Sequence, residues 1–256
     1  MFLSTRISSA ARLVGATALL MLIGAHAGDG QPRAAQHALP PGLTVTPVRI
    51  TMPSGQMTTT LTIDNNTGRE IGFQVRPFTW SEPGGATEQL TRTDNLAVSP
   101  PIGTIPNGGR QVVRLVLRQA AKGGQESDYR ILFDQVPPPP QPGVVNFAYR
   151  FSIPVFVQTA ATTRAAPRVR WSLQNDRGAY YLVATNSGGA HDAFHNIALV
   201  SPRGPVTVQQ DSSPYVLPGA TRRWRITSNG FSPSGQAIRV TAQADSGPVD
   251  QPVTGP

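Results

Sequence analysis

Residues 144–157 read Val-Val-Asn-Phe-Ala-Tyr-Arg-Phe-Ser-Ile-Pro-Val-Phe-Val, and this apolar run decides how the rest of the chain is interpreted. As an extended strand, it places three large side chains on one face, namely Val145, Phe147 and Tyr149. We assign the remaining apolar side chains to the other face, with a change of face at Phe151: Val144, Ala148, Phe151, Ile153 and Val155. Both faces are then apolar, whereas an ordinary sandwich strand has one polar face.

Pro154 interrupts this run and indicates where the strand lies in its sheet. Proline has no amide hydrogen to donate to a ladder, so it belongs on an edge strand or at a bulge. An edge with large exposed apolar side chains invites pairing with a further strand, because edges are normally protected by charge. Residues 137–143 begin with a stiff run of prolines and end in a flexible glycine. Such a segment would let a long loop project the start of the strand. The same periodicity also fits a strand buried within one sandwich.

The rest of the chain has the pattern of an all-β protein. Its 25 glycines and 25 prolines exclude long helices, in which each proline costs about 3 kcal/mol. No segment has a sustained apolar period of about 3.6 residues. Short strand-like runs recur instead, separated by turn residues, at 43–50, 58–63, 71–78, 111–118, 129–136, 169–173, 179–186, 196–200, 206–208, 221–227 and 237–242. This spacing predicts β-sandwiches or barrels.

A small, polar stretch at residues 160–166 predicts a linker between two domains, at 43–159 and 167–244. Residues 245–256 are rich in Gly, Pro and Asp, and we expect them to form a disordered tail. Residues 1–27 have the features of a secretory signal peptide, with Arg6 and Arg12 before an apolar run that ends near a small-x-small site. Residues 28–42 would then be a flexible lead-in, and the processed chain would have no transmembrane segment.

Composition and motifs weaken the case for several functions. The net charge is +8, but the basic residues are scattered, so a nucleic-acid surface is not indicated. The chain has no cysteine, and His191 and His195 lie in a loop-like region without a third ligand, so we expect no metal site. No nucleophile motif, phosphate loop or dinucleotide fingerprint is present. We therefore expect a protein without cofactor that is not an enzyme.

Six short blocks occur in an order that resembles a known family. They include Thr-Pro-Val-Arg-Ile at 46–50, Ser-Pro-Pro at 99–101, Ile-Pro-Asn-Gly-Gly-Arg at 105–110, Tyr-Arg-Ile-Leu-Phe at 129–133, Ser-Ile-Pro-Val-Phe at 152–156, and Tyr-Val-Leu-Pro-Gly at 215–219 followed by Trp224. Together, these blocks resemble the periplasmic pilus/fimbrial assembly chaperones of the chaperone–usher pathway. The Ser-Pro-Pro and Ile-Pro-Val-Phe blocks most resemble the archaic, spore-coat-protein-like branch.

The resemblance implies two immunoglobulin-like β-sandwich domains in a boomerang arrangement. It implies a periplasmic chaperone that fills the open groove of a pilus subunit with its own donor strand and delivers the subunit to an outer-membrane usher. Val145, Phe147 and Tyr149 would enter that groove. Family chaperones hold the C-terminus of the subunit with two basic residues, and Arg49 matches the first. Pro154 occupies the usual Lys position, so we expect Arg150, on the same strand, to substitute.

Two further points remain open from the sequence. The free chaperone could cap its donor strand by forming a homodimer. The alternative function is a secreted two-domain β-sandwich adhesion or carbohydrate-binding module. Such a module would not need Val145, Phe147 and Tyr149 in register beside an arginine-lined cleft, so this feature distinguishes the two functions.

Overall fold

The computed structural model describes residues 42–85, 88–140, 142–143, 145–209, 213–228, 230–233, 235 and 237–255. These residues belong to one compact unit. The expected signal peptide at 1–27 lies outside the described residues, as does the lead-in at 28–42 except for Gly42. The described part of the chain holds no helix of the length and apolarity that a membrane span requires.

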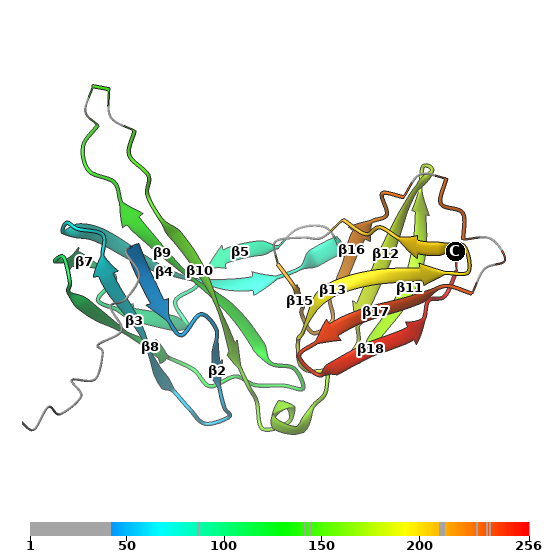
Figure 1. Ribbon diagram of the computed structural model, residues 1–256. Coiled ribbons are helices and arrows are strands. Elements are labelled where there is room, and N and C mark those ends of the chain that lie inside the picture. Colours follow the sequence, from blue (N-terminus) through cyan, green and yellow to red (C-terminus); the bar gives the residue numbers. More distant parts are fainter. Residues whose placement is uncertain are drawn as a thin grey trace, which may run out of the picture. The chain divides into compact units, whose positions relative to one another are not determined.

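The first sandwich is built from two sheets (Figure 1). One has the order β1-β3-β8-β6, with β1 at Gly42–Thr46, β3 at Thr58–Asn66, β8 at Arg110–Leu117 and β6 at Leu96–Ser99. The other has the order β2-β10-β9-β4-β5, with β2 at Ile50–Met52, β10 at Arg150–Val157, β9 at Ser127–Val136, β4 at Ile71–Ser81 and β5 at Gln89–Arg92. The short β7 at Ile102–Ile105 pairs with β4, and the 3-10 turn η1 at Pro83–Gly85 follows β4.

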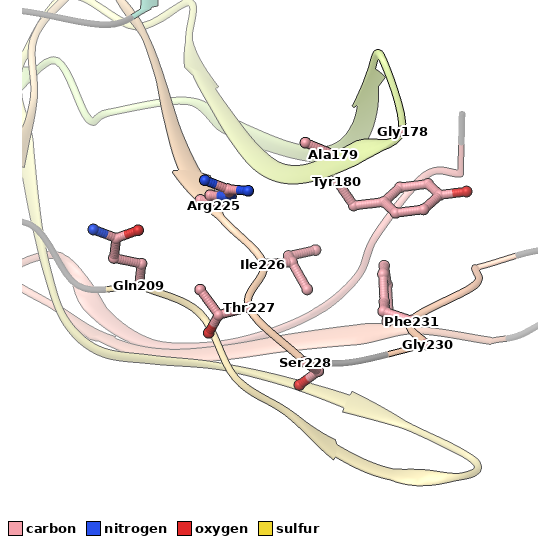
Figure 2. Close-up of a pocket in the computed structure, with 10 residues that line it drawn as sticks. All are labelled: Gly178, Ala179, Tyr180, Gln209, Arg225, Ile226, Thr227, Ser228, Gly230 and Phe231. Carbon is pink, nitrogen blue, oxygen red and sulfur yellow. The ribbon is translucent and has the colours of Figure 1, made fainter.

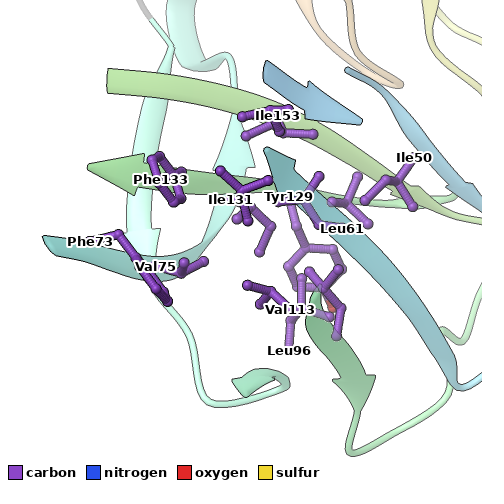
Figure 3. Packing of buried hydrophobic residues seen from close by; sticks show 14 of the residues in the cluster. Ile50, Leu61, Phe73, Val75, Leu96, Val113, Tyr129, Ile131, Phe133 and Ile153 are labelled. Atoms are coloured by element: carbon purple, nitrogen blue, oxygen red, sulfur yellow. The ribbon is translucent and has the colours of Figure 1, made fainter. Parts of the chain in front are cut away.

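The core of the first sandwich follows from alternation along these strands. Alternate side chains point inward from both sheets, because successive side chains of a strand point to opposite faces. Figure 3 shows Leu61, Val113 and Leu96 of the first sheet meeting residues such as Ile131 and Ile153 of the second. Each of these side chains is buried, so this core is what holds β10 in place.

The second sandwich also has two sheets. One has the order β11-β12-β16, with β11 at Val169–Asp176, β12 at Ala179–Asn186 and β16 at Thr221–Arg225. The other has the order β14-β13-β17-β18, with β14 at Gly204–Val206, β13 at Asp192–Ser201, β17 at Arg239–Ala244 and β18 at Gly247–Pro252. The two-residue β15 at Tyr215–Val216 pairs with β13. Trp171 and Trp224 stack in its core, with ring centroids 5.8 Å apart.

These sheets confirm the predicted all-β fold with two β-sandwiches. The described residues contain no α-helix, only η1 and a second 3-10 turn, η2, at Thr162–Arg164. Each sandwich has its own apolar core. The turn η2 lies between the two sandwiches along the chain, where hydrogen bonds between Thr159 and Thr162 hold it.

The expectation of a disordered tail from residue 245 onward is wrong. Residues 247–252 form β18, which pairs with β17 over its whole length. Ser246 immediately precedes this strand, and its backbone and hydroxyl donate hydrogen bonds to the carboxylate of the buried Asp192. Val249 and Val253 then pack against the second core. These apolar contacts and the pairing with β17 therefore outweigh the local preference of Gly and Pro for irregular structure.

Strand β10 differs from the sequence prediction in two ways. It begins at Arg150 rather than at residue 144, and it lies between β9 and β2 instead of at an edge along its full length. However, the parallel pairing with β2 covers only Val155–Val157. Residues 150–154 therefore pair with β9 on one side and with no strand among the described residues on the other.

Candidate functional site

An apolar row continues from the core of the first sandwich into solvent at the start of β10. Ile153 is buried and Phe151 is partly buried against the core. Tyr149 is 49% exposed, Phe147 80% and Val145 79%. These residues occupy alternate positions, so the prediction that Phe151, Ile153 and Val155 lie on the face opposite Tyr149 is wrong. Within β10, Phe151, Ile153 and Val155 alternate without a register shift in the pairing with β9, and the ring of Tyr149, just before the strand, stacks on Phe151.

Aromatic contacts make this row continuous. Tyr149 stacks on Phe151 with ring centroids 6.1 Å apart. Phe151 in turn lies 6.1 Å from the ring of Phe133, which stacks on Phe73 at 5.6 Å. The exposed residues are thus the outer end of a row whose inner end fills the chain's own core.

Among the described residues, the backbone of the exposed segment forms hydrogen bonds only at its end next to β10. The amide of Gln135 donates to the carbonyl of Tyr149 at 2.9 Å, and the amide of Tyr149 donates to Oε1 of Gln135 at 3.2 Å. Residues 145–148 belong to no strand. In Figure 1, the connection between β9 and β10 extends well beyond the end of both strands.

An open hollow of about 520 Å³ lies beside this segment. Its lining combines the exposed apolar side chains with polar groups from neighbouring strands and turns: Gly42, Asn66, Thr67, Arg69, Gln135, Val145, Asn146, Phe147 and Tyr149. An apolar segment with a free backbone edge beside such a hollow can accept a further strand by main-chain hydrogen bonding.

Arg49 lies immediately before β2 and forms an ion pair with Asp245, which follows β17. Its side chain is half-exposed. Burial works against the charge, but the hydrogen bond and negative charge of Asp245 outweigh it, and the pKa of Arg49 is raised. The guanidinium therefore stays charged and remains accessible to a second anionic group.

Arg150 is the first residue of β10, and its exposed side chain forms an ion pair with Asp134 on β9. Arg76 of β4 donates to the same carboxylate at 2.6 Å. Burial of Asp134 opposes ionisation, but the hydrogen bonds from Arg150 and Arg76 outweigh it and lower the pKa of Asp134.

The structure does not bring Arg49 and Arg150 together. Ile50, next to Arg49, pairs with Val155. Arg150 precedes Val155 by five positions, which is about 16 Å of extended strand. The two arginines therefore lie at different positions along the length of β10, and each is paired with a different carboxylate of this chain.

Arg130 is a cation at this face that the sequence prediction missed. It lies directly opposite Pro154 in the β9–β10 ladder and is only 6% exposed. Its guanidinium carbon lies 3.7 Å from the ring centroid of Trp80, and Nη2 donates to Glu88 at 3.2 Å. Its Nε is buried without a hydrogen-bond partner among the described residues, and burial lowers the pKa of Arg130. The only sequence signal was a charge within the apolar run at 129–133.

Buried polar contacts join the two sandwiches next to Arg130. Glu82 accepts hydrogen bonds from the amide of Leu217 and from Nη1 of Arg222, both at 2.9 Å. Burial raises the pKa of Glu82, although Leu217 and Arg222 oppose this shift. A small apolar cluster surrounds these contacts, consisting of Trp80, Phe156, Leu217 and Ala220, with Leu90 and Tyr215 at its edge.

A second hollow, of about 500 Å³, lies at one end of the second sandwich (Figure 2). Figure 2 shows Tyr180 and Phe231 at one side and Arg225 and Gln209 at the other. Among the described residues, those that line it include no carboxylate and no histidine. They therefore provide no acid–base pair for catalysis.

Comparison with known proteins places these features in context. The family model described as "Pili and flagellar-assembly chaperone, PapD N-terminal domain" matches residues 42–162. None of the curated proteins compared with the chain matches it.

Several solved structures share the fold. A chain of the CsuC–CsuE chaperone–tip adhesion subunit pre-assembly complex from archaic chaperone–usher Csu pili of Acinetobacter baumannii is 21% identical, with a TM-score of 0.64, and 84% of this chain and 99% of that chain are covered. The E. coli chaperone DraB is 16% identical, with a TM-score of 0.57 and coverage of 83% and 97%. A chain of the Salmonella enterica SafA pilin–SafB chaperone complex is 15% identical, with a TM-score of 0.56 and coverage of 84% and 96%.

At these identities, the structural matches establish the fold, and the family model matches the first sandwich. Both agree with the all-β architecture. Residues 42–162 thus match the model of the PapD N-terminal domain of pili and flagellar-assembly chaperones, and the two-sandwich fold of the chain is shared with solved structures of chaperone–usher pilus chaperones.

Proposed function

We propose that the chain is a periplasmic chaperone that binds pilus subunits by donor-strand complementation and passes them to an outer-membrane usher. The observation that carries this proposal is the exposure of Val145, Phe147 and Tyr149 in line with the buried core residues of β10. Each of these side chains would stabilise the chain by about 1.5–3 kcal/mol if it were buried, and this free energy is not gained while the side chain is exposed. A partner that buries them recovers that free energy.

The backbone of the same segment would supply the pairing. Residues 145–148 lie in no strand, so their amides and carbonyls are available to a subunit that lacks one strand of its sandwich. Main-chain hydrogen bonds would hold that subunit without regard to sequence, and the alternate apolar side chains would set the register. No nucleotide or covalent step is needed, so the proposed chaperone is not an enzyme and uses no cofactor.

Arg49 and Arg150 are the proposed anchors for the C-terminal carboxylate of the subunit. Arginine suits this role because its planar guanidinium holds a carboxylate through two parallel hydrogen bonds. Their separation along β10 implies that one carboxylate contacts one of them at a time, so they would serve alternative registers of the bound subunit. Arg130, buried opposite Pro154 with Nε unpaired among the described residues, is a third candidate near the Arg49 end.

Co-purification tests this proposal. The tagged chain is expressed in a host that assembles chaperone–usher pili and is recovered from the periplasm. The proteins that co-purify with it are identified by mass spectrometry. We expect a pilus subunit with the wild-type chain and its loss with Phe147→Asp. Val200→Asp is the matched control, because Val200 is also an exposed apolar residue but lies on β13 of the second sandwich. Equal recovery of the subunit with both variants would reject the donor strand.

A further inference from the structure

A cluster of three potential metal ligands lies where the two sandwiches meet. Glu126 precedes β9, Asp128 lies within β9, and His191 precedes β13. One donor atom of each residue lies within 4.8 Å of the donor atoms of the other two. Nδ1 of His191 is 2.6 Å from Oε1 of Glu126. None of these residues belongs to the exposed donor segment, so the cluster is independent of the proposed subunit-binding site.

One carboxylate of the cluster, that of Asp128, lacks an ion-pair partner among the described residues. Glu82 is paired with Arg222, Glu88 with Arg130, and Glu126 with His191. Asp128 makes none of the ion pairs found among the described residues, and its Oδ1 is buried without a hydrogen-bond partner there. A buried oxygen atom without a partner is costly, and a cation beside it would remove that cost.

The ring of His191 and the loop that precedes it are held in place before any ion binds. The ring of His191 stacks on Phe156 with centroids 3.4 Å apart and planes at 10°. The amide of Glu126 donates to the carbonyl of Gly189 at 3.0 Å, which fixes the loop before His191 against the first sandwich. A Cβ atom at Gly189 would lie 2.6 Å from the carbonyl oxygen of Gly124, so only glycine allows this approach.

We propose that Glu126, Asp128 and His191 form a binding site for a divalent transition-metal ion, with Zn²⁺ as the best match, that links the two sandwiches. One imidazole nitrogen and two carboxylate oxygens suit Zn²⁺, with water as a fourth ligand. Two ligand atoms of one tetrahedral Zn²⁺ lie about 3.3 Å apart. The contact between His191 and Glu126 would therefore widen by less than about 1 Å, and the ion would replace the proton between them. His195, exposed on β13, takes no part.

Metal titration of the processed chain tests this site. The protein is freed of metal with EDTA, dialysed, and titrated with ZnSO₄ by calorimetry, and with Co²⁺ while the visible spectrum is recorded. We expect one ion per chain and an intense Co²⁺ spectrum typical of tetrahedral coordination. Asp128→Asn and His191→Phe should each weaken binding by about 10- to 100-fold or more. His191→Phe keeps an aromatic ring against Phe156, and circular dichroism verifies that both variants fold.

His195→Ala is the matched control and should bind Zn²⁺ as the wild-type chain does. The proposal is overturned if the wild-type chain binds no ion at a 1:1 ratio. It is equally overturned if Asp128→Asn and His191→Phe bind with wild-type affinity, or if only His195→Ala loses binding. None of these outcomes depends on the capture of a pilus subunit, so the site and the proposed chaperone function are tested separately.

Discussion

The ring of Tyr149 stacks on the ring of Phe151 with an interplanar angle of 19°, and this contact marks the boundary between the chain's own core and its exposed segment. On one side of it, Phe151 packs against Phe133 inside the first sandwich. On the other side, Phe147 and Val145 are among the most exposed large apolar residues described. One strand sequence therefore both completes a sandwich and presents an unpaired apolar edge.

Phe147→Ala should leave stability almost unchanged, because an exposed side chain contributes within about 0.5 kcal/mol to the free energy of unfolding. Phe133→Ala, at the buried end of the same row, should cost about 3–5 kcal/mol. Urea unfolding of the two variants measures this difference. A loss of more than about 2 kcal/mol in Phe147→Ala would mean that Phe147 belongs to the core.

Arg49→Ala should fold normally but bind less of the pilus subunit. Its ion pair with Asp245 is half-exposed, and pairs of this kind contribute about 0–1 kcal/mol. Asp245→Asn is the control, because it breaks the same ion pair and leaves the guanidinium in place. Recovery of the subunit should therefore fall in Arg49→Ala and not in Asp245→Asn. An equal fall in both variants would assign a structural role to the ion pair and none to the cation.

Asp134→Asn should change the acid limb of the stability profile. The folded state lowers the pKa of Asp134, so its contribution to stability is complete above the unfolded value of about 3.9 and is lost as pH falls through the folded-state pKa. The variant lacks this group and should lose stability less steeply below about pH 4. Urea unfolding at a series of pH values measures the slope.

Arg150→Ala provides the intermediate case for the same measurement. It removes one of the two arginines that hold the Asp134 carboxylate and leaves Arg76 in place. Its acid limb should therefore lie between those of the wild-type chain and Asp134→Asn. If all three stability profiles coincide, these ion pairs contribute nothing to the stability of the folded state in solution.

Glu82→Ala should weaken the junction between the two sandwiches. The substitution removes the acceptor of the buried Leu217 amide and the carboxylate that Arg222 contacts, at a cost of about 2–3 kcal/mol. Glu88→Ala is the control, since Glu88 is exposed and its single contact with Arg130 is long. Thermal unfolding should show a clear decrease for Glu82→Ala and little change for Glu88→Ala. Similar decreases in both variants would show that the buried contacts of Glu82 contribute no more to stability than the exposed contact of Glu88.

The sequence was sufficient for the all-β fold, because turn residues and alternating apolar positions are local signals. It also identified Val145, Phe147 and Tyr149 as an apolar set, and these side chains are exposed. The face of Phe151 was predicted wrongly, because a change of face was assumed where the strand alternates without a bulge.

Other features depend on contacts between distant segments and have no local signal. Arg130 becomes a candidate site residue only in the folded chain, because β9 places it opposite Pro154 and the ring of Trp80 covers its guanidinium group. Likewise, Glu126 and His191 meet across 65 positions of sequence. The sequence did not predict that the C-terminal segment forms a strand, because its Gly and Pro residues favour turns. Pairing with β17 determines its structure instead.

Hydrogen exchange at the amides of residues 145–148 tests the central claim most directly, with the free chain compared with the complex that co-purifies from the periplasm. We expect fast exchange in the free chain, because these amides belong to no strand, and slowing by at least about 100-fold in the complex as a strand of the pilus subunit pairs with them. Slow exchange already in the free chain, or the same fast exchange in both samples, would contradict an open edge that pairs with a strand of the bound partner.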